Sequence, residues 1–173
     1  MEFIRSLFKL LEDVHPSLDE ILAALFQHRE DAAANFYRDS SINIPDMHSD
    51  PEVQKMIKDK IGETASLRAE TTIHTDGMED DLTVFLDLRM KDAKLTITIE
   101  GTAYASIPVG DGQGIVEHKD SFTIDTSGKS AEDVYNAICL RVESFASEVE
   151  SALEAEGEGW DTDEEDDGDD NET

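Results

Sequence analysis

The chain has 173 residues, of which 42 are Asp or Glu and 14 are Lys or Arg, so its formal net charge is −28 at pH 7. Hydrophobic residues make up 38%, which is enough for one folded core and argues against a wholly disordered chain. Because duplex DNA and anionic membranes are themselves negative, this charge argues against unaided binding to either of them.

Two features bear on the cellular compartment. Cys139 is the one cysteine, which excludes an intramolecular disulfide, and its amphipathic helical surroundings predict a small buried thiol. The apolar residues near the N-terminus are interrupted by charges, unlike a secretory signal, and no stretch approaches the roughly 20 apolar residues of a membrane span. We therefore expect an intracellular protein in the cytoplasm, with no membrane association.

The N-terminal part of the chain has the pattern of amphipathic helices. Apolar residues recur at helical spacing over residues 1–14. Ser17 stands three residues before Glu20, which is typical of a capping box and predicts a second helix whose apolar face continues to about Tyr37. After a polar loop, Asp50 followed by proline predicts the start of a third helix.

Further along, the spacing of apolar residues changes to a period of two, which is typical of half-buried strands. Gly101 interrupts one of these segments, and we expect a bulge there. Short connections favour an antiparallel meander with one apolar and one polar face. The predicted strands begin at Leu67, Leu82 and Leu95, and residues 116–124 could form a fourth.

The last predicted element is a long helix that begins at Ser130, with Asp133 as its capping partner, and ends near Leu153. From Glu154 onward there are 12 acidic residues and no Lys or Arg, which predicts a tail that repels itself and does not order alone. We therefore predict one α+β domain over residues 1–153 and a disordered acidic tail over residues 154–173. In this domain, N-terminal helices and the long C-terminal helix pack in two layers on an antiparallel sheet of three or four strands.

The folded part is strongly acidic even without the tail, since residues 1–153 hold 30 acidic and 14 basic residues, a net charge of −16. Such a surface is complementary to basic grooves that normally hold nucleic acid. We therefore expect a non-enzymatic interaction protein that binds a basic nucleic-acid-binding partner. It would act as a DNA-mimic inhibitor or a chaperone, in the manner of phage and mobile-element proteins that oppose host defence in the host cytoplasm. The expected partner-binding residues are Glu79, Asp80 and Asp81 in the domain and Asp161, Asp163, Glu164, Glu165, Asp166 and Asp167 in the tail.

Three alternatives stay open. The charge could serve solubility alone. An acid-tailed single-stranded-DNA-binding or replication accessory protein would combine basic and stacking residues on a modest groove. An acidic assembly or secretion-type chaperone, which we expect to be a homodimer, would hold its partner along an exposed sheet edge. The candidate single-strand-binding residues are Lys55, Lys58, Lys60, Phe85, Arg89, Lys91 and Lys94.

Motifs for catalysis or metal binding do not reach their required patterns. Gly128 to Ser130 resembles the end of a phosphate loop, but Thr123 stands where that loop needs glycine. A calcium-loop pattern that starts at Asp163 ends before its twelfth position, and the five histidines lack metal-ligand spacing. The sequence therefore predicts no enzyme, no cofactor and no metal site.

Overall fold

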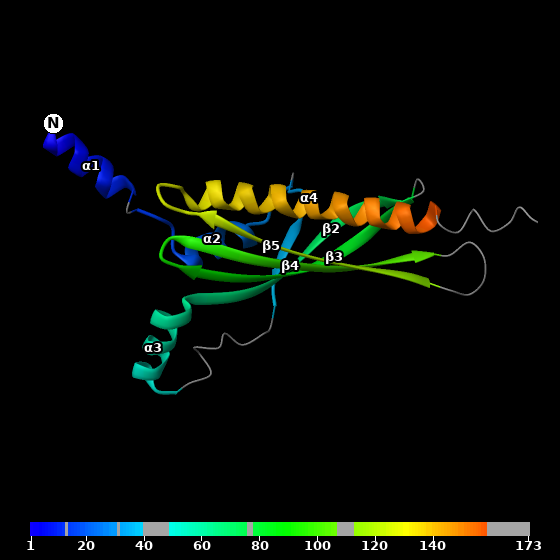
Figure 1. Ribbon diagram of the computed structural model, residues 1–173, viewed down its shortest axis with the longest axis horizontal. Helices are drawn as coiled ribbons and strands as arrows, with labels where there is room; N and C mark the ends of the chain where they lie inside the picture. The colour runs from blue at the N-terminus through cyan, green and yellow to red at the C-terminus, as the bar shows by residue number, and fades with distance from the viewer. Residues whose placement is uncertain (13, 31, 40–48, 76–77, 107–112, 159–173) are drawn as a thin grey trace, which may run out of the picture.

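The computed structural model describes residues 1–12, 14–30, 32–39, 49–75, 78–106 and 113–158. Its elements follow one another as four helices and five strands among these residues, drawn in Figure 1. In chain order they are α1 (Glu2–Glu12), α2 (Leu18–Phe26), β1 (Asn35–Arg38), α3 (Pro51–Ile61), β2 (Glu63–Thr75), β3 (Met78–Lys91), β4 (Lys94–Ser106), β5 (Gln113–Asp125) and α4 (Ala131–Glu158).

The strands form one antiparallel sheet in the order β1-β2-β3-β4-β5, so each strand pairs with its neighbours in sequence. This confirms the α+β class and the meander. The prediction of three or four strands is wrong, because β1 is a fifth strand in the place where the second helix was expected to continue to Tyr37. Residues 27–31 read Gln-His-Arg-Glu-Asp and offer no apolar face for a helix to bury. The chain therefore leaves α2 at Phe26 and pairs Phe36 with Ala69 along the edge of β2.

The core lies between one face of the sheet and two helices, α2 and α4, with α4 running across the sheet (Figure 1). Alternate residues of the strands point into this layer, as the period of two predicted. The expectation that all the N-terminal helices pack on the sheet is wrong, because α3 has no buried residue and the large apolar side chains described in α1 are exposed. Fully buried side chains include Leu82, Val84, Leu86, Leu95, Ile97, Ile99, Val134, Ile138, Val142 and Val149.

The three predicted helix starts are confirmed. The Glu20 N–H donates to Ser17 Oγ at 3.2 Å, and the Ser17 N–H donates to the Glu20 carboxylate at 2.8 Å. The Glu52 N–H donates to the side chain of Asp50 at 2.8 Å. At α4 the N–H and hydroxyl of Ser130 both donate to Asp133, and these hydrogen bonds hold the pKa of Asp133 below its usual value.

Gly101 does not mark a bulge in the pairing with β5, whose register with β4 continues unbroken through it, while the pairing of β4 with β3 ends at Gly101. Its role is steric. A Cβ atom at this position would lie 2.8 Å from Cε1 of Phe145 and 3.1 Å from Cγ1 of Val84. The missing side chain therefore makes the space in which the Phe145 ring of α4 packs on the middle of the sheet.

The C-terminal helix continues to Glu158, five residues past the predicted end of the domain at Leu153. Residues 159–173 lie outside the described part of the chain. Among the described residues, no helix combines the length and the apolar character needed to cross a membrane.

The packing of Phe145 yields a stability prediction. Phe145 is 2% exposed, so replacing it with alanine leaves a cavity against Gly101 and we expect Phe145→Ala to lower the free energy of unfolding by about 3–5 kcal/mol. Leu140→Ala on the same helix is the control, since Leu140 is 66% exposed and its loss is expected to cost less than about 0.5 kcal/mol. Urea denaturation followed by circular dichroism measures both. Equal effects of the two substitutions would contradict this account of the core.

Candidate functional site

The face of the sheet opposite α4 carries polar and charged side chains at alternate positions of every strand. Reading across the strands, the register places Tyr37 beside Arg68, Arg68 beside Phe85, Phe85 beside Glu100 and Glu100 beside Lys119. None of the described helices packs across this face (Figure 1). This face of the sheet is therefore left uncovered by the described helices.

Charge is distributed very unevenly along the sequence. Residues 69–88, 95–118 and 142–173 contain no Lys or Arg, yet they hold 6, 3 and 15 acidic residues, which is 24 of the total of 42. The rest of the chain holds the other 18 acidic residues together with all 14 Lys and Arg, for a net charge of −4. The charge of −28 therefore belongs almost entirely to three stretches.

The fold brings some of these carboxylates toward one end of the molecule, whereas Glu70, Asp87 and Glu100 of the same stretches lie further along the sheet. That end is where β2 finishes, β3 starts, β4 finishes and β5 starts. The C-terminal half of α4 reaches the same end, because the backbone N–H of His74 on β2 donates to the Glu150 carboxylate at 2.8 Å. We call this end of the sheet, with the adjoining part of α4, the acidic end. Its exposed carboxylates include Glu79, Asp80, Asp81, Glu117, Glu148 and Glu154.

Of the predicted partner-binding residues, Glu79, Asp80 and Asp81 lie together at the start of β3 within the acidic end. All three are exposed, and none takes part in an ion pair between described residues. The predicted tail residues Asp161, Asp163, Glu164, Glu165, Asp166 and Asp167 lie outside the described residues.

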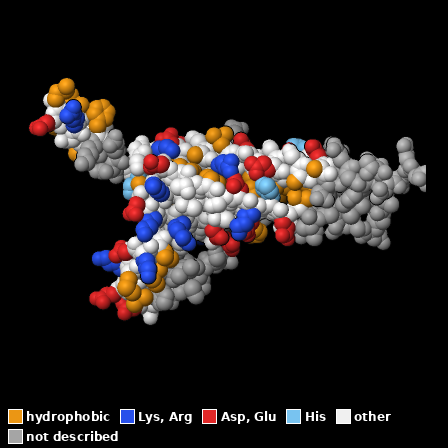
Figure 2. Space-filling model, viewed as in Figure 1, with side chains coloured by type: hydrophobic (Ala, Val, Ile, Leu, Met, Phe, Trp, Pro, Cys, Tyr) orange, Lys and Arg blue, Asp and Glu red, His pale blue; other side chains and the backbone are white. Residues whose placement is uncertain are grey.

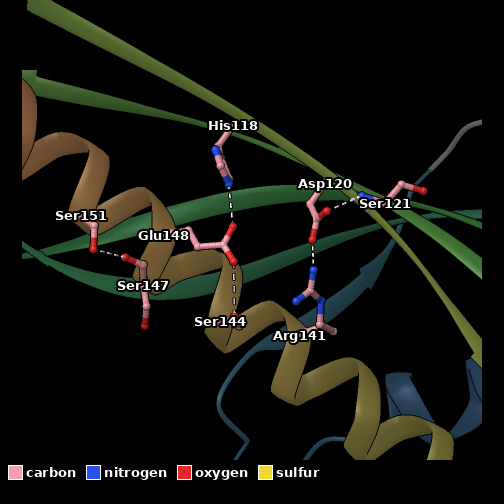
Figure 3. A network of polar contacts seen from close by, with 8 residues as sticks. All are labelled: His118, Asp120, Ser121, Arg141, Ser144, Ser147, Glu148 and Ser151. Atoms are coloured by element: carbon pink, nitrogen blue, oxygen red, sulfur yellow. Dashed lines mark hydrogen bonds and ion pairs between the residues drawn. The ribbon is translucent and has the colours of Figure 1, made fainter.

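Other carboxylates join β5 to α4, as Figure 3 shows, and sequence reasoning missed them. Nε2 of His118 lies 2.7 Å from the Glu148 carboxylate, and Arg141 forms an ion pair with Asp120. Arg141 and Glu148 are seven residues apart, so they lie on one face of α4. A seven-residue spacing of charged side chains on a long helix is the sequence signal that could have identified this contact between β5 and α4.

The predicted single-strand-binding residues come together at the opposite end of the sheet, where β3 ends and β4 begins. Lys91 Nζ donates to the backbone carbonyl of Lys60 at 3.0 Å, which joins the end of α3 to the β3–β4 hairpin. Glycine at position 62 allows this close approach. Gly62 has φ +85°, and a Cβ atom there would lie 2.3 Å from the Met90 carbonyl oxygen. Figure 2 shows Lys and Arg side chains gathered over α3 and the adjoining part of the sheet. We call this cluster the basic end, and its residues are Lys55, Lys58, Lys60, Arg89, Lys91 and Lys94.

Phe85 lies in the row that crosses the sheet, four residues from Arg89 along β3, with Asp87 between them on the same face. It is 52% exposed, and Tyr37 in the same row is 42% exposed. The Arg68 guanidinium between them lies 5.1 Å from the centroid of the Tyr37 ring. Sequence reasoning found Phe85 but missed Tyr37 and Arg68, because Tyr37 was expected in a helix and its strand spans only four residues.

A cavity of about 200 Å³ lies between the end of α2, β1 and the start of α4. Arg29 lies on one side, with its guanidinium 3.8 Å from the centroid of the Tyr135 ring and two hydrogen bonds of 2.5 and 2.7 Å to Glu132. The guanidinium lowers the pKa of Glu132. The charges of Arg29 and Glu132 are thus engaged with each other, and this ion pair links the segment after α2 to α4.

Cys139 lies nearby on α4 and is half-buried rather than fully buried. Burial raises the pKa of its thiol, with the carboxylate of Glu143 adding to the shift. The raised pKa leaves little thiolate at neutral pH, and thiolate is the nucleophilic form. Within the described part of the chain, no group of three or more His, Cys, Asp or Glu side chains is arranged to hold a metal ion.

Comparison with models of protein families, with curated protein sequences and with solved structures finds no match to this chain.

The environment of Cys139 predicts slow alkylation. Because the pKa of the thiol is raised, we expect iodoacetamide at pH 8 to modify the folded protein several-fold more slowly than it modifies free glutathione. Mass spectrometry against time measures the rate. The same protein unfolded in urea is the control and should react at about the glutathione rate. A folded-state rate equal to or above that of glutathione would contradict the prediction.

Proposed function

We propose that this chain is a non-enzymatic interaction protein that binds a basic nucleic-acid-binding protein through its acidic end. It would act in the cytoplasm, as a DNA-mimic inhibitor or as a chaperone of that partner. The observation that carries the proposal is a group of carboxylates toward one end, in stretches of sequence without Lys or Arg, and it comprises Glu79, Asp80, Asp81, Glu117, Glu148, Glu150 and Glu154.

The charge density of the acidic end is comparable to that of DNA. Its part of α4, residues 142–158, is about 25 Å long at 1.5 Å per residue. Duplex DNA of this length carries roughly 15 charges. The described residues of the three stretches hold 13 carboxylates, and 10 remain when Glu70, Asp87 and Glu100, which lie away from this end, are left out. A cationic groove made for nucleic acid would meet an anion of similar size and charge.

The position of Glu79, Asp80 and Asp81 supports a role for them in contact with the partner. They are exposed and engaged by no described cation, so a partner's Lys or Arg would not have to displace an internal ion pair. Glu148 and Asp120, in contrast, are already used between β5 and α4. The start of β3 is therefore where substitution tests recognition with least effect on folding.

The test compares two variants that change the charge equally. In the first, Glu79→Gln, Asp80→Asn and Asp81→Asn remove three charges from the acidic end. Immobilised full-length protein is incubated with nuclease-treated lysate of the native host, and retained proteins are eluted with a short DNA duplex. For a partner displaced by the duplex, we expect this variant to bind roughly tenfold more weakly at low salt, and the difference to shrink as salt rises.

The matched control is Asp19→Asn, Glu30→Gln and Asp59→Asn, which removes three exposed carboxylates outside the acidic end. We expect its affinity to stay close to that of the unaltered protein. Equal weakening by both variants would mean that net charge alone matters, as expected if the charge serves solubility. Failure of the duplex to displace any retained protein would overturn the proposal.

A second candidate function is favoured by the row that crosses the sheet beside the basic end. Phe85 and Tyr37 offer exposed rings with Arg68 between them, and Arg89 and Lys91 lie further along β3 on the same face, beyond Asp87. Stacking of bases on aromatic side chains next to a cationic groove is the means by which single strands bind without sequence preference. This surface would suit single-stranded DNA, with the acidic end kept away from it.

A fluorescence titration with a labelled single-stranded oligonucleotide tests this candidate. We expect Phe85→Ala to weaken binding about 5- to 100-fold, since stacking contributes roughly 1–3 kcal/mol per base. Leu140→Ala, at a 66% exposed apolar position on α4, is the control and should change nothing. A chain that ends at Glu158, which keeps α4 whole, is expected to bind more tightly than the full chain. Absence of binding by both chains would eliminate this function.

A further inference from the structure

The most apolar exposed surface among the described residues is α1. Its described large apolar side chains, with that of Met1 just before it, are between 48 and 95% exposed, and they belong to Met1, Phe3, Ile4, Leu7, Phe8 and Leu10. At 100° per residue these positions cover one half of the helix, while Glu2, Arg5 and Ser6 fall on the other half. Apolar and polar residues are thus fully separated, which is typical of a helix whose apolar face packs against another surface.

A helix of this kind does not stand alone in water. Isolated helices shorter than about 12–15 residues are marginal, and α1 has 11 residues. Figure 1 shows α1 projecting away from the sheet and from α4. Packing on the sheet stabilises α2 and α4. We therefore expect α1 to be stabilised by packing against another molecule.

The exposed apolar area is the amount that a stable dimer needs. Large apolar side chains present about 150–250 Å² each when free, so the six exposed fractions together amount to roughly 600–1,000 Å² per copy. A standard protein interface buries about 800 Å² on each partner. The apolar half of α1 alone supplies that area.

The charge distribution decides which molecule covers it. The sequence of α1 holds Arg5 and Lys9 against Glu2 and Glu12, so two copies of this helix bring no net charge together. α1 also leaves the body at the end opposite the acidic end, since the Gly128 N–H just before α4 donates to the Val14 carbonyl at 2.8 Å. Two copies joined here would hold their acidic ends far apart. A cationic partner would gain nothing from a neutral helix, and an anionic membrane would be repelled by the net charge of −28.

We propose that the apolar half of α1 is a self-association surface that pairs with α1 of a second copy of this chain. The resulting dimer is isologous, with the same apolar patch on both copies. Its acidic ends face outward and stay free for the partner of the proposed function.

The test is the mass of the full-length protein in solution, measured by sedimentation equilibrium between about 1 and 100 µM. We expect a species of twice 19.2 kDa with a dissociation constant in the micromolar range. Raising the salt concentration should strengthen the dimer, because it screens the repulsion between two strongly negative chains. Weakening by salt would instead indicate pairing of the basic end of one copy with the acidic end of another, and would overturn the proposal.

Leu7→Glu places a charge in the apolar half of α1 and is expected to raise the dissociation constant at least tenfold. Met56→Glu on α3 is the matched control, since Met56 is 63% exposed and the substitution adds the same charge. It should leave the dimer unchanged. A dimer that persists in the Leu7→Glu variant, or a single 19.2 kDa species at every concentration, would overturn the proposal. Flotation with phosphatidylcholine vesicles completes the test, because vesicle binding by a monomer would assign α1 to a lipid surface instead.

Discussion

The contact between Phe145 and Gly101 determines how α4 is placed on the sheet. The Phe145 ring of α4 occupies the space that the missing side chain of Gly101 leaves, next to Val84 on the neighbouring strand. Because a close-packed interior tolerates little displacement, this contact sets where α4 lies along β3 and β4. The C-terminal half of the helix then falls beside the start of β3 and the end of β2. The chemistry of the surface follows from an apolar contact in the middle of the core.

The meander turns a scattered sequence pattern into two separate surfaces. Exposed carboxylates lie at the start of β3, on β5 and in the second half of α4, and the antiparallel order of the strands brings them toward one end. The same pairing brings Arg89, Lys91 and Lys94 to the other end, where the bond from Lys91 to the Lys60 carbonyl adds α3. The body is therefore not uniformly acidic. A group of carboxylates and a group of Lys and Arg side chains, the latter interspersed with carboxylates such as Asp59 and Asp92, lie at opposite ends of a single sheet.

Much of the fold could be predicted because its signals are local. Ser17 with Glu20, Asp50 before proline and Ser130 with Asp133 each satisfy backbone groups within a few residues, so helix starts can be read from sequence. Gly101 and β1 could not be predicted. The reason for Gly101 is a ring 44 positions away, and β1 has only Phe36 facing inward, which is too short a stretch to reveal a period of two. The candidate binding residues could be predicted one by one. Their separation into two groups at opposite ends could not be predicted, because it depends on strand register.

The separation of charge along the sheet makes the protein a strong electric dipole. In the field of a cationic surface, such a molecule experiences a torque once it is within about a Debye length of contact, and this torque turns its negative pole forward. Encounters then begin with the molecule already aligned, so fewer collisions are lost to wrong orientations. An equal charge spread evenly over the same fold would attract from afar but would leave orientation to rotational diffusion.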